Sequence, residues 1–303
     1  MLDISVIILT YNEEIHIQRC LESVNLFASK VFVVDCFSTD RTVEIAESLG
    51  ATVVHHIWPG NQAEQFNWAL ENIDIKTGWV LRVDADEYLE PELIEELYIK
   101  LPTMRSEVSA VVIPIGREFM GRRLHHGIVN GVALTRLFRT GKVHYELRLM
   151  DEYMNIHSGE TISFEHAIVD ASLIGLKAFI DKHNNYSSRE AVLLLDAEFN
   201  LTANGENNVN YEYAKEVVKK RVQKAKYSRM PLFWRAFAYF VYRYIVKMGF
   251  LDGKEGFCWD FFQGLWYRML VDAKIYEAKK VCGNDKQLMI TYIKEKFGIQ
   301  LKS

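Results

Sequence analysis

The sequence predicts an α/β protein: a Rossmann-like, mainly parallel central sheet with flanking helices, followed by a helical C-terminal region. Two observations predict this fold. Over the first hundred residues, apolar strand-like runs alternate with segments of helical periodicity, the pattern of parallel strands joined by right-handed crossovers. After about residue 170 the patterns are mainly helical.

The first hundred residues contain four strand–helix repeats. Each expected strand is a short apolar run, and each is followed by a stripe of apolar residues three or four apart. The expected strands are 4–11, 30–35, 51–56 and 79–86. The expected helices are 17–24, 43–49, 66–73 and 92–101. Between about 108 and 165, short apolar segments separated by turns predict added, partly antiparallel strands.

Composition narrows the class of protein. Of the 303 residues, 49% are hydrophobic and 25% charged, as in a globular protein. The four cysteines lie far apart, which argues against a zinc knuckle and fits a reducing compartment. The apolar N-terminus lacks a basic region and a cleavage site, so we expect a buried strand rather than a signal peptide.

The charge is unevenly distributed. The first 100 residues hold 18 acidic and 6 basic side chains, a net charge of −12, and the remaining 203 carry +8. Neither part suggests a protein that binds nucleic acid.

Polar clusters follow three of the expected strands. They comprise Thr10 to Glu13 after the first, Asp35 to Asp40 after the second, and Asp84, Asp86 and Glu87 after the fourth. Ligands of such sheets bind beyond the carboxyl ends of the strands, so we expect the clusters to converge on one crevice.

The third cluster predicts a metal ion. Like charges this close repel unless a cation lies among them. The sequence has neither a GxGxxG turn after its first strand nor a P-loop, so a bound diphosphate would need another counter-charge. Asp84 and Asp86, on either side of Ala85, could bind Mg²⁺ or Mn²⁺ bridging a nucleotide diphosphate.

Three segments in this order, TYNEE, VVDCFSTDRT and VDADEYL, resemble the nucleotide-binding elements of inverting family 2 glycosyltransferases with a GT-A fold. The sequence DAD is then the DXD motif. The closer resemblance is to bacterial lipopolysaccharide-core and cell-surface polysaccharide β-glycosyltransferases, through AEQFNWAL, RLFR and GFLDGKEGF at 63–70, 136–139 and 249–257. A Pro-Asp expected shortly before RLFR is replaced by GVALT.

The resemblance implies roles for the polar clusters. Asp35 would read the base or ribose, and Gln65 and Asn67 would approach the diphosphate or sugar. The implied nucleotide-sugar-binding residues are Thr10, Tyr11, Asn12, Glu13, Asp35, Ser38, Asp40, Gln65, Asn67, Asp84, Ala85 and Arg136. The implied metal ligands are Asp86, Asp84 and His166.

Several of these residues have a second interpretation. Asn12 and Ser38 could be helix caps. Arg136 could form a structural salt bridge instead of contacting a phosphate. His166 could be a core histidine, and Glu87 could be a solvated neighbour of the metal site rather than a ligand.

An inverting transfer needs a base for the acceptor hydroxyl. By the resemblance, Glu152 is the first candidate and Asp151 the second. On a strand the two would point to opposite faces, so only one could face the crevice. His144 and Glu146 form a rival pair on one face.

The C-terminal region contains an aromatic and aliphatic segment, 231–253. Its Arg235, Tyr239, Arg243 and Lys247 fall four apart on one stripe. We expect this helix to lie in a membrane interface with its basic side chains at anionic headgroups, since no segment has the eighteen or so uncharged residues of a spanning helix. The alternative is a helical pair packed on the catalytic domain.

Together these expectations describe a metal-dependent inverting glycosyltransferase. It would transfer a sugar from a nucleotide-diphosphate sugar, UDP-linked, to a lipid-linked or lipopolysaccharide acceptor at the cytoplasmic face of the membrane. Residues 1–168 would form the GT-A domain, with 1–104 binding the donor and 105–168 adding acceptor-side strands, and 169–303 would form the helical region. The alternatives are transfer to polyprenyl phosphate and a non-catalytic nucleotide-sugar-binding protein.

Overall fold

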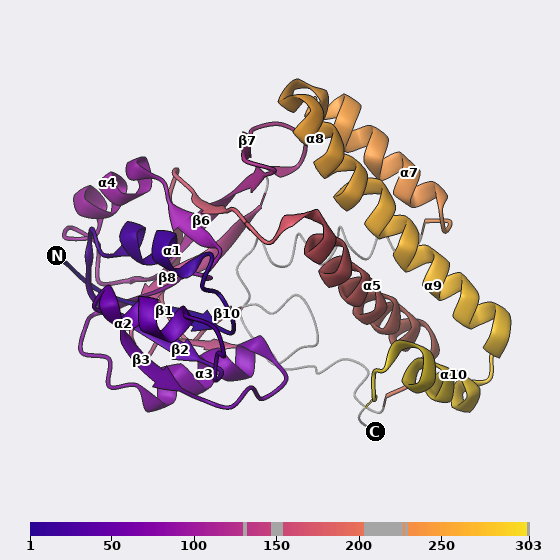
Figure 1. The fold of residues 1–303 in the computed structure, drawn as a ribbon, viewed down its shortest axis with the longest axis horizontal. Helices are drawn as coiled ribbons and strands as arrows, with labels where there is room; N and C mark the ends of the chain where they lie inside the picture. Colours follow the sequence, from indigo (N-terminus) through magenta and orange to yellow (C-terminus); the bar gives the residue numbers. More distant parts are fainter. Residues whose placement is uncertain (130–131, 147–153, 203–226, 228–229, 302–303) are drawn as a thin grey trace. The chain divides into compact units, whose positions relative to one another are not determined.

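The computed structural model describes residues 1–129, 132–146, 154–202, 227 and 230–301 (Figure 1). The described residues form two compact units, Met1–Leu173 and the residues from Ile174 onward. Each unit is described by itself below.

The first unit begins with four parallel strands in the order β3-β2-β1-β4. These strands are β1 (Leu2–Thr10), β2 (Ala28–Asp35), β3 (Thr52–His55) and β4 (Trp79–Arg82). The helices between and after them are α1 (Ile17–Val24), α2 (Thr42–Ser48), α3 (Gln62–Asn72) and α4 (Pro91–Lys100). The alternation predicted from the sequence is therefore confirmed, although the fourth strand ends at Arg82, four residues earlier than expected.

The later strands extend this sheet from β4 in the order β8-β6-β12-β5. β8 is antiparallel to both β4 and β6, and β5 is antiparallel to β12, whereas β12 is parallel to β6. The bounds are β5 (Glu87–Leu89), β6 (Val108–Phe119), β7 (Arg122–Leu124), β8 (Ala133–Arg139), β11 (Glu160–Ser163) and β12 (Ile168–Asp170). A separate antiparallel hairpin is formed by β9 (Val143–Tyr145) and β10 (Met154–Ile156). The predicted mixed fold with a mainly parallel central sheet is confirmed.

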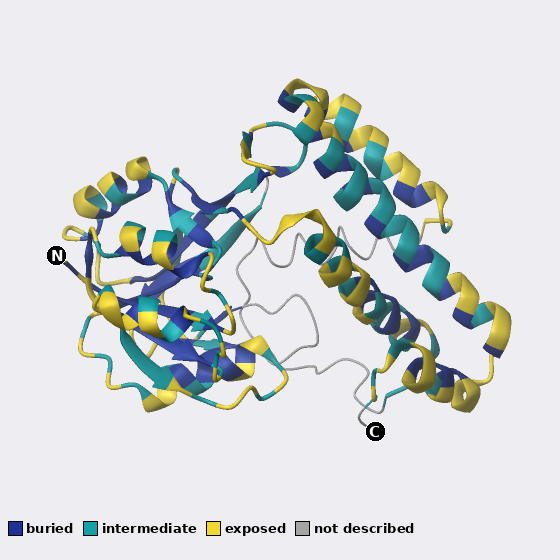
Figure 2. Ribbon diagram, viewed as in Figure 1, coloured by how far each residue is buried: buried dark blue, intermediate teal, exposed yellow. Residues whose placement is uncertain are grey.

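The two faces of β1 are buried in different clusters. Ile4, Val6 and Ile8 belong to the cluster that includes α1, and Ile7 belongs to the cluster that includes Phe66 of α3. Alternate residues of a strand point to opposite faces, so helices on both sides bury the whole strand. Figure 2 shows this layer of buried strands. Burying each such side chain contributes about 1.5–3 kcal/mol, and the sheet forms a rigid support for the loops at its carboxyl edge.

The second unit is helical, as predicted. Its first helix, α5 (Gly175–Phe199), packs along α9 through Ala191 and Leu195. The other segments are α7 (Trp234–Val241), η2 (Tyr242–Val246), η3 (Gly249–Asp252), α8 (Gly253–Trp259), η4 (Asp260–Trp266), α9 (Tyr267–Cys282), α10 (Lys286–Tyr292) and η5 (Ile293–Phe297). Among the described helices, none combines the length and apolar composition needed to cross a bilayer.

The prediction that the basic stripe of this region faces anionic headgroups is wrong for Arg235 and Arg243. Arg235 is 2% exposed and donates from Nε to Asp272 of α9 at 2.8 Å. Arg243 is 6% exposed and donates from Nε to Asp260 of η4 at 2.7 Å. Both side chains are therefore bound inside the helical unit, where they cannot reach lipid headgroups. Lys247 is exposed.

Candidate active site

The loops after β1 and β2 are tied together by side chains. The backbone N–H of Asn12 donates to Ser38 Oγ at 2.8 Å, and Asn12 Oδ1 accepts from the N–H of Thr39 at 2.8 Å. Asn12 has a φ of 56°, a left-handed conformation that asparagine tolerates better than most residues. The residues at the N-caps of α1 and α2 are His16 and Arg41. Asn12 and Ser38 are therefore loop-joining residues rather than helix caps.

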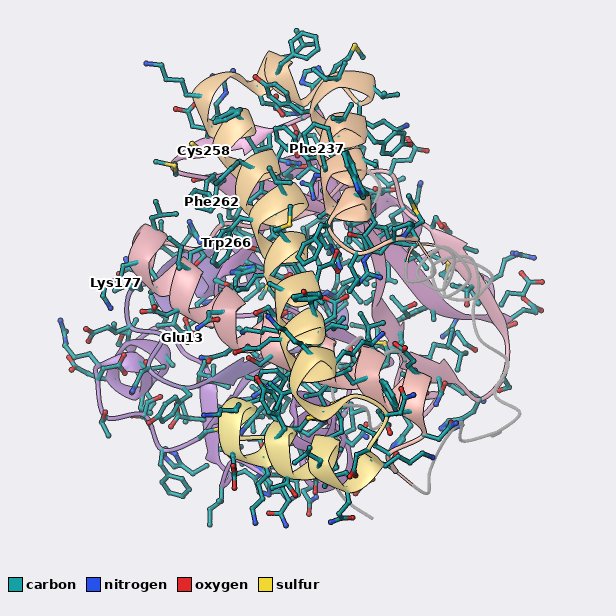
Figure 3. All side chains as sticks on the ribbon, turned by 90° about the vertical axis from the view of Figure 1, so that its right-hand side faces the viewer. Glu13, Lys177, Phe237, Cys258, Phe262 and Trp266 are labelled. Atoms are coloured by element: carbon teal, nitrogen blue, oxygen red, sulfur yellow. The ribbon has the colours of Figure 1, made fainter. Side chains whose placement is uncertain are left out.

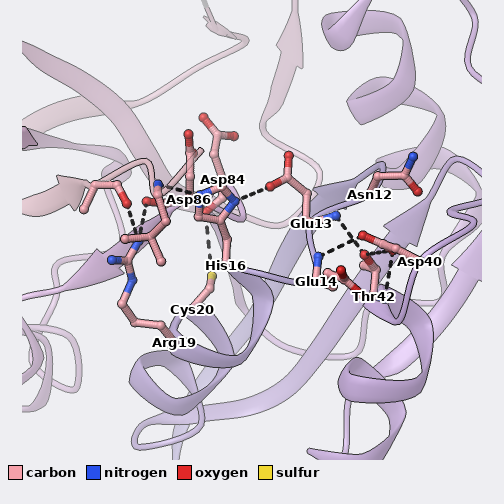
Figure 4. A network of polar contacts seen from close by, with 12 residues as sticks. Asn12, Glu13, Glu14, His16, Arg19, Cys20, Asp40, Thr42, Asp84 and Asp86 are labelled. Atoms are coloured by element: carbon pink, nitrogen blue, oxygen red, sulfur yellow. Dashed lines mark hydrogen bonds and ion pairs between the residues drawn. The ribbon is translucent and has the colours of Figure 1, made fainter. Parts of the chain in front are cut away.

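A second set of bonds joins the same loops further out (Figure 4). Asp40 accepts from the N–H of Glu14 at 3.1 Å and from the N–H and Oγ1 of Thr42. The Oγ1 of Thr42 in turn accepts from the N–H of Glu13 at 2.8 Å. Desolvation opposes ionisation of Asp40, but the hydrogen bonds from Thr42 and Glu14 lower its pKa. The carboxylate of Asp40 is thus a fixed part of the loop framework.

Asp35 ends β2 and is fully buried. Its carboxylate accepts from Thr10 Oγ1 at 2.9 Å and from the N–H and Oγ of Ser38 at 2.8 and 2.5 Å. His55 Nδ1 lies 3.4 Å away. The Thr10–Asp35–Ser38 group is saturated by bonds within the protein, so it shapes the edge of the sheet. Tyr11 and Phe37 are large exposed aromatic side chains at this edge, and Phe37 stacks on His55 with ring centroids 5.3 Å apart.

His16 connects Glu13 to the end of the first unit. The backbone N–H of Leu173 donates to His16 Nε2 at 2.8 Å, and Glu13 Oε2 lies 2.6 Å from His16 Nδ1. Since an amide N–H can only donate, Nε2 must accept, and the ring proton lies on Nδ1 facing Glu13. His16 is 2% exposed, so this arrangement fixes one oxygen of the half-exposed Glu13 carboxylate.

The DAD segment turns sharply after β4 and lies beside two buried arginines. Asp84 accepts from Arg82 Nε at 3.3 Å and from Arg136 Nη2 at 3.1 Å. Burial by itself would raise the pKa of Asp84, but Arg136 and Arg82 more than offset it and hold the pKa well below its usual range. Asp84 therefore stays ionised at any physiological pH.

Glu87 is buried, contrary to the interpretation of a solvated neighbour. It is 2% exposed, accepts from Arg136 Nη2 at 2.6 Å and accepts from the N–H of Asp84 at 2.8 Å. Burial raises the pKa of Glu87 to about 8 against the opposing charge of Arg136, and the charge of Asp84 adds to the rise. Arg136 is therefore engaged by a buried ion-pair network, the second of the two roles considered for it.

Asp86 follows on the same turn, after the buried Ala85. Its backbone carbonyl accepts from Arg19 Nη2 at 3.1 Å and from the N–H of Ala171 at 3.0 Å, which fixes the turn. The pKa of the buried Cys20 thiol is raised by burial and by the charges of Glu87, Asp84 and Asp86. The three carboxylates are therefore all close enough to act on Cys20, and Figure 4 shows Asp84 and Asp86 in the same region as Glu13 and His16.

The structure does not bring His166 to this cluster. Its Nδ1 lies 3.0 Å from Glu96 Oε2 on α4, and its backbone N–H donates to the same oxygen at 3.1 Å. Asp170 of β12 pairs with Glu87 of β5, the neighbour of Asp86, and Ile168 pairs with Leu89. His166 precedes Ile168, so it lies toward the end of this strand pair that is farther from Asp86. The expectation that His166 binds the metal together with Asp84 and Asp86 is replaced by a structural contact with α4.

Gln65 and Asn67 of α3 are also occupied within the protein. Asn67 Nδ2 donates to the carbonyl of Tyr145 at 2.9 Å, and its Oδ1 accepts from the N–H of Tyr145 at 2.8 Å. Gln65 is fully buried between Cys36 and His56. Neither amide has the exposure that a donor contact needs, so the geometry gives both residues the task of holding neighbouring segments.

Asp151 and Glu152, the candidate bases, lie outside the described residues. The described strand that precedes them, β9, contacts Arg82. Arg82 lies over the ring of Tyr145 at 4.8 Å, and Met154 pairs with Tyr145 across the β9–β10 hairpin. Tyr145 of β9 therefore lies next to Arg82, which pairs with Asp84. The rival His144 is bound to Asn67 Nδ2 through Nε2 at 3.0 Å.

The cluster suits a divalent cation. Mg²⁺ and Mn²⁺ in nucleotide sites use one or two carboxylates and complete their coordination with water and phosphate oxygens. Asp84 and Asp86 supply two carboxylates, and Glu87 is held by Arg136. No set of three or more histidine, cysteine or acidic side chains in the described ranges forms a complete metal site. Such an ion would therefore depend on oxygen ligands from the diphosphate.

Comparison with known proteins identifies the family of the chain. Residues 5–163, a little over half of the chain, match the family model of glycosyl transferase family 2. The chain belongs to this family and is a glycosyltransferase.

Two relatives show the extent of the similarity. An uncharacterized glycosyltransferase of Rickettsia bellii is 45% identical over 94 residues, 31% of this chain and 31% of that relative. One from Rickettsia typhi is 28% identical over 258 residues, 85% of this chain and 81% of that protein. This chain thus matches less than a third of the length of the first relative.

Solved structures give partial matches. A crystal structure of S. aureus TarS is 17% identical with a TM-score of 0.45, covering all of this chain and 93% of that one. Glucosyl-3-phosphoglycerate synthase from Mycobacterium tuberculosis, in complex with Mn²⁺ and UDP, is 23% identical with a TM-score of 0.32, covering 38% of this chain and 44% of that one.

Sequence reasoning missed four residues of the site. His16, Arg82, His55 and Phe37 were given no functional role, although Arg82 immediately precedes the quoted VDADEYL segment. An arginine flanked by apolar residues in a buried strand is itself a signal, because its charge requires a carboxylate nearby. The other three depend on contacts between loops that a linear pattern does not reveal.

Proposed function

We propose that the protein is a metal-dependent inverting glycosyltransferase that uses a nucleotide-diphosphate sugar, UDP-linked, and a lipid-linked or cell-surface polysaccharide acceptor such as lipopolysaccharide. The observation that carries the proposal is the Asp84–Asp86 turn. It lies at the carboxyl edge of a family 2 sheet, beside Glu13 and the saturated Asp35 group, with an ionised Asp84 held by two arginines.

In the proposed reaction, an acceptor hydroxyl attacks the anomeric carbon from the face opposite the diphosphate. The new bond to the acceptor oxygen forms as the bond to the diphosphate oxygen breaks, and the hydroxyl proton passes to Glu152 or Asp151. A bound divalent ion supplies Lewis-acid stabilisation of the charge on the leaving diphosphate. Asp84 and Asp86 would hold that ion, and Arg82 and Arg136 keep Asp84 ionised and in place.

The donor would be positioned mainly by exposed groups of the first two loops. Thr10, Asp35 and Ser38 set the shape of the floor, while Tyr11 and Glu13 offer a ring and a carboxylate oxygen to the nucleotide. We therefore assign the nucleotide to the edge formed by these loops. Residues 1–168 would carry catalysis, and the helical residues 169–303 would serve the acceptor at the cytoplasmic membrane face.

The test is release of nucleoside diphosphate from a panel of sugar nucleotides with Mn²⁺, Mg²⁺ or EDTA. Slow donor hydrolysis by water needs no known acceptor. The variants are Asp86→Asn and Glu152→Gln, with Asp74→Asn as a matched control because Asp74 is an exposed carboxylate paired only with the exposed Lys76. We expect metal-dependent release of one diphosphate, lost in Asp86→Asn and retained in Asp74→Asn.

Other results of the same assay would favour one of the two alternative functions or contradict the metal role. Metal-dependent nucleotide binding without turnover, even with polyprenyl phosphate and lipid-linked acceptors, would indicate a nucleotide-sugar-binding protein. Turnover only with polyprenyl phosphate would establish that acceptor class. Equal turnover in EDTA would contradict the metal role of Asp84 and Asp86.

A further inference from the structure

In the second unit, α7 and η2 form one arm of a helical hairpin, and α8, η4 and α9 form the other. This hairpin exposes an apolar surface where a hairpin of a soluble protein would normally be polar. Along α7 and η2, Trp234, Phe237, Val241 and Ile245 recur three or four residues apart and are all exposed, Trp234 to 72%. Figure 3 shows Phe237 on α7, with Cys258, Phe262 and Trp266 along the antiparallel arm. Arg235 and Arg243, which lie between these apolar residues, are bound to Asp272 and Asp260. The arginine side chains therefore face the interior of the unit, and the apolar side chains face outward.

The apolar surface continues around the end of the hairpin. Val246, Met248, Phe250, Leu251 and Phe257 are exposed on η2, η3 and α8. An open groove of about 550 Å³ lies in this region, and it is lined by Tyr244, Phe250, Gly253, Lys254, Phe257 and Cys258. Large contiguous apolar patches are rare on soluble monomers and mark interaction sites.

The glycine-rich GFLDGKEGF segment, residues 249–257, forms the turn at this end of the hairpin. A Cβ on Gly249 would lie 1.9 Å from Asp260 Oδ2, and one on Gly256 would lie 2.6 Å from the carbonyl of Gly249. Gly253 has a φ of 71°. The glycines therefore allow a tight turn with a buried Asp260 beneath it, and the turn presents Phe250 and Leu251 to the outside.

The fully exposed charged side chains around the apolar surface are lysines. Lys247 and Lys254 are exposed. Of the carboxylates between residues 230 and 260, Asp252 and Asp260 are buried and Glu255 is half-buried. Aromatic and aliphatic side chains rimmed by exposed lysines, with two of the three acids of this range buried, match the chemistry of an anionic lipid surface.

We propose that the exposed surface of α7, η2, η3 and α8 docks on a membrane bearing anionic lipids, with Phe250 and Leu251 inserted and Lys247 and Lys254 at the headgroups. This deepens the proposed function and rests on it for the lipid-linked acceptor. It replaces the expected arrangement, in which Arg235 and Arg243 would meet the headgroups.

The experiment is co-sedimentation of the full chain with vesicles of phosphatidylcholine alone, or of equal parts phosphatidylcholine and phosphatidylglycerol. We expect binding to the anionic vesicles that weakens with salt. Phe250→Ser with Leu251→Ser should reduce it about tenfold or more, because both apolar side chains lose their transfer from water. Lys247→Glu with Lys254→Glu should reduce it by a similar factor, since each change replaces attraction to the anionic surface by repulsion.

Matched controls test the location. Leu26→Ser with Ile99→Ser removes two apolar side chains of the first unit that are more exposed than Phe250 and Leu251, and Lys280→Glu with Lys286→Glu reverses two exposed lysines elsewhere in the second. Both controls should bind as the wild type does. Absence of wild-type binding, or equal losses in variants and controls, would overturn the proposal. So would a dimer in sedimentation equilibrium that the Phe250 and Leu251 changes dissociate, because the surface would then bind a second copy.

Diphosphate release measured without vesicles separates this proposal from the proposed function. The surface variants should keep wild-type release while losing vesicle binding. Vesicle binding by a protein that releases no diphosphate from any donor would leave the surface standing and overturn the proposed enzymatic function instead.

Discussion

Each unit buries two arginines against carboxylates, but the balance of charge differs between them. In the second unit Arg235 is bound by Asp272 and Arg243 by Asp260. In the first, Arg82 and Arg136 lie beside Asp84, Asp86 and Glu87. A buried arginine with one carboxylate is sufficient for architecture, whereas in the first unit two arginines hold one ionised carboxylate, Asp84, in place beside Asp86, and Glu87, whose pKa is raised to about 8, is largely protonated at neutral pH. The same interaction therefore serves structure in one unit and supports chemistry in the other.

The largest effect should separate the two kinds of pair. Arg136→Ala and Arg235→Ala should each lower the free energy of unfolding by about 3–5 kcal/mol, because each leaves buried carboxylate charge without its partner. Adding Mn²⁺ should restore part of the stability of Arg136→Ala and none of that of Arg235→Ala. Urea unfolding with and without Mn²⁺ measures this, and equal responses of the two variants would remove the distinction.

A smaller effect tests the role of α3 in the first unit. Asn67→Ala should lower stability by roughly 1–3 kcal/mol, because it leaves the N–H and carbonyl of the buried Tyr145 unpaired. Since Tyr145 precedes the segment with the candidate bases, kcat should fall while the KM for the donor stays unchanged. A rise in donor KM with unchanged kcat would restore the donor-contact role inferred from the resemblance.

A comparison of glycines tests the second unit. Gly249→Ala should lower stability by roughly 1–3 kcal/mol, because its Cβ would overlap Asp260 and approach the Arg243 carbonyl at 3.2 Å. Gly264→Ala is the comparison, since its Cβ would make a tight contact with Arg243 Cδ at 3.1 Å and lie 3.6 Å from backbone, without the overlap that occurs at Gly249. Thermal unfolding of both variants should show a lower Tm for Gly249→Ala alone.

The smallest effect concerns the floor of the nucleotide edge. Thr10→Val removes the bond to Asp35 Oδ1, which still accepts from Ser38 Oγ. The expected loss is about 1 kcal/mol of stability with donor turnover largely kept. Complete loss of donor binding would show that Thr10 contacts the nucleotide directly.

Much of the fold could be predicted because burial leaves a local pattern. The alternation of apolar runs located β1 to β4, and the position of the carboxylates after a buried run located the turn at Asp84. The partners of those carboxylates could not be found in this way. β8 lies antiparallel to β4, with Leu137 opposite Leu81, so the register brings Arg136 beside Arg82 across more than fifty residues. Only the sheet order supplies that contact.

The helical region shows a second kind of limit. The four-residue spacing of Arg235, Tyr239 and Arg243 correctly predicted one stripe on a helix. Spacing does not show, however, which side of a helix faces the interior. This stripe faces inward because Asp260 and Asp272 lie on the opposing helical arm. A carboxylate at matching intervals in a following helix would have been the signal.

The bond from Leu173 to His16 has a mechanical consequence. Leu173 is the last residue of the first unit, and its amide holds the imidazole whose other nitrogen faces Glu13. Pulling the chain away at this point would remove the hydrogen-bond donor from Nε2, and the ring would no longer be held in the orientation that fixes Glu13. Tension on the connection to the helical unit would thereby be transmitted to the donor-side loop through a single side chain.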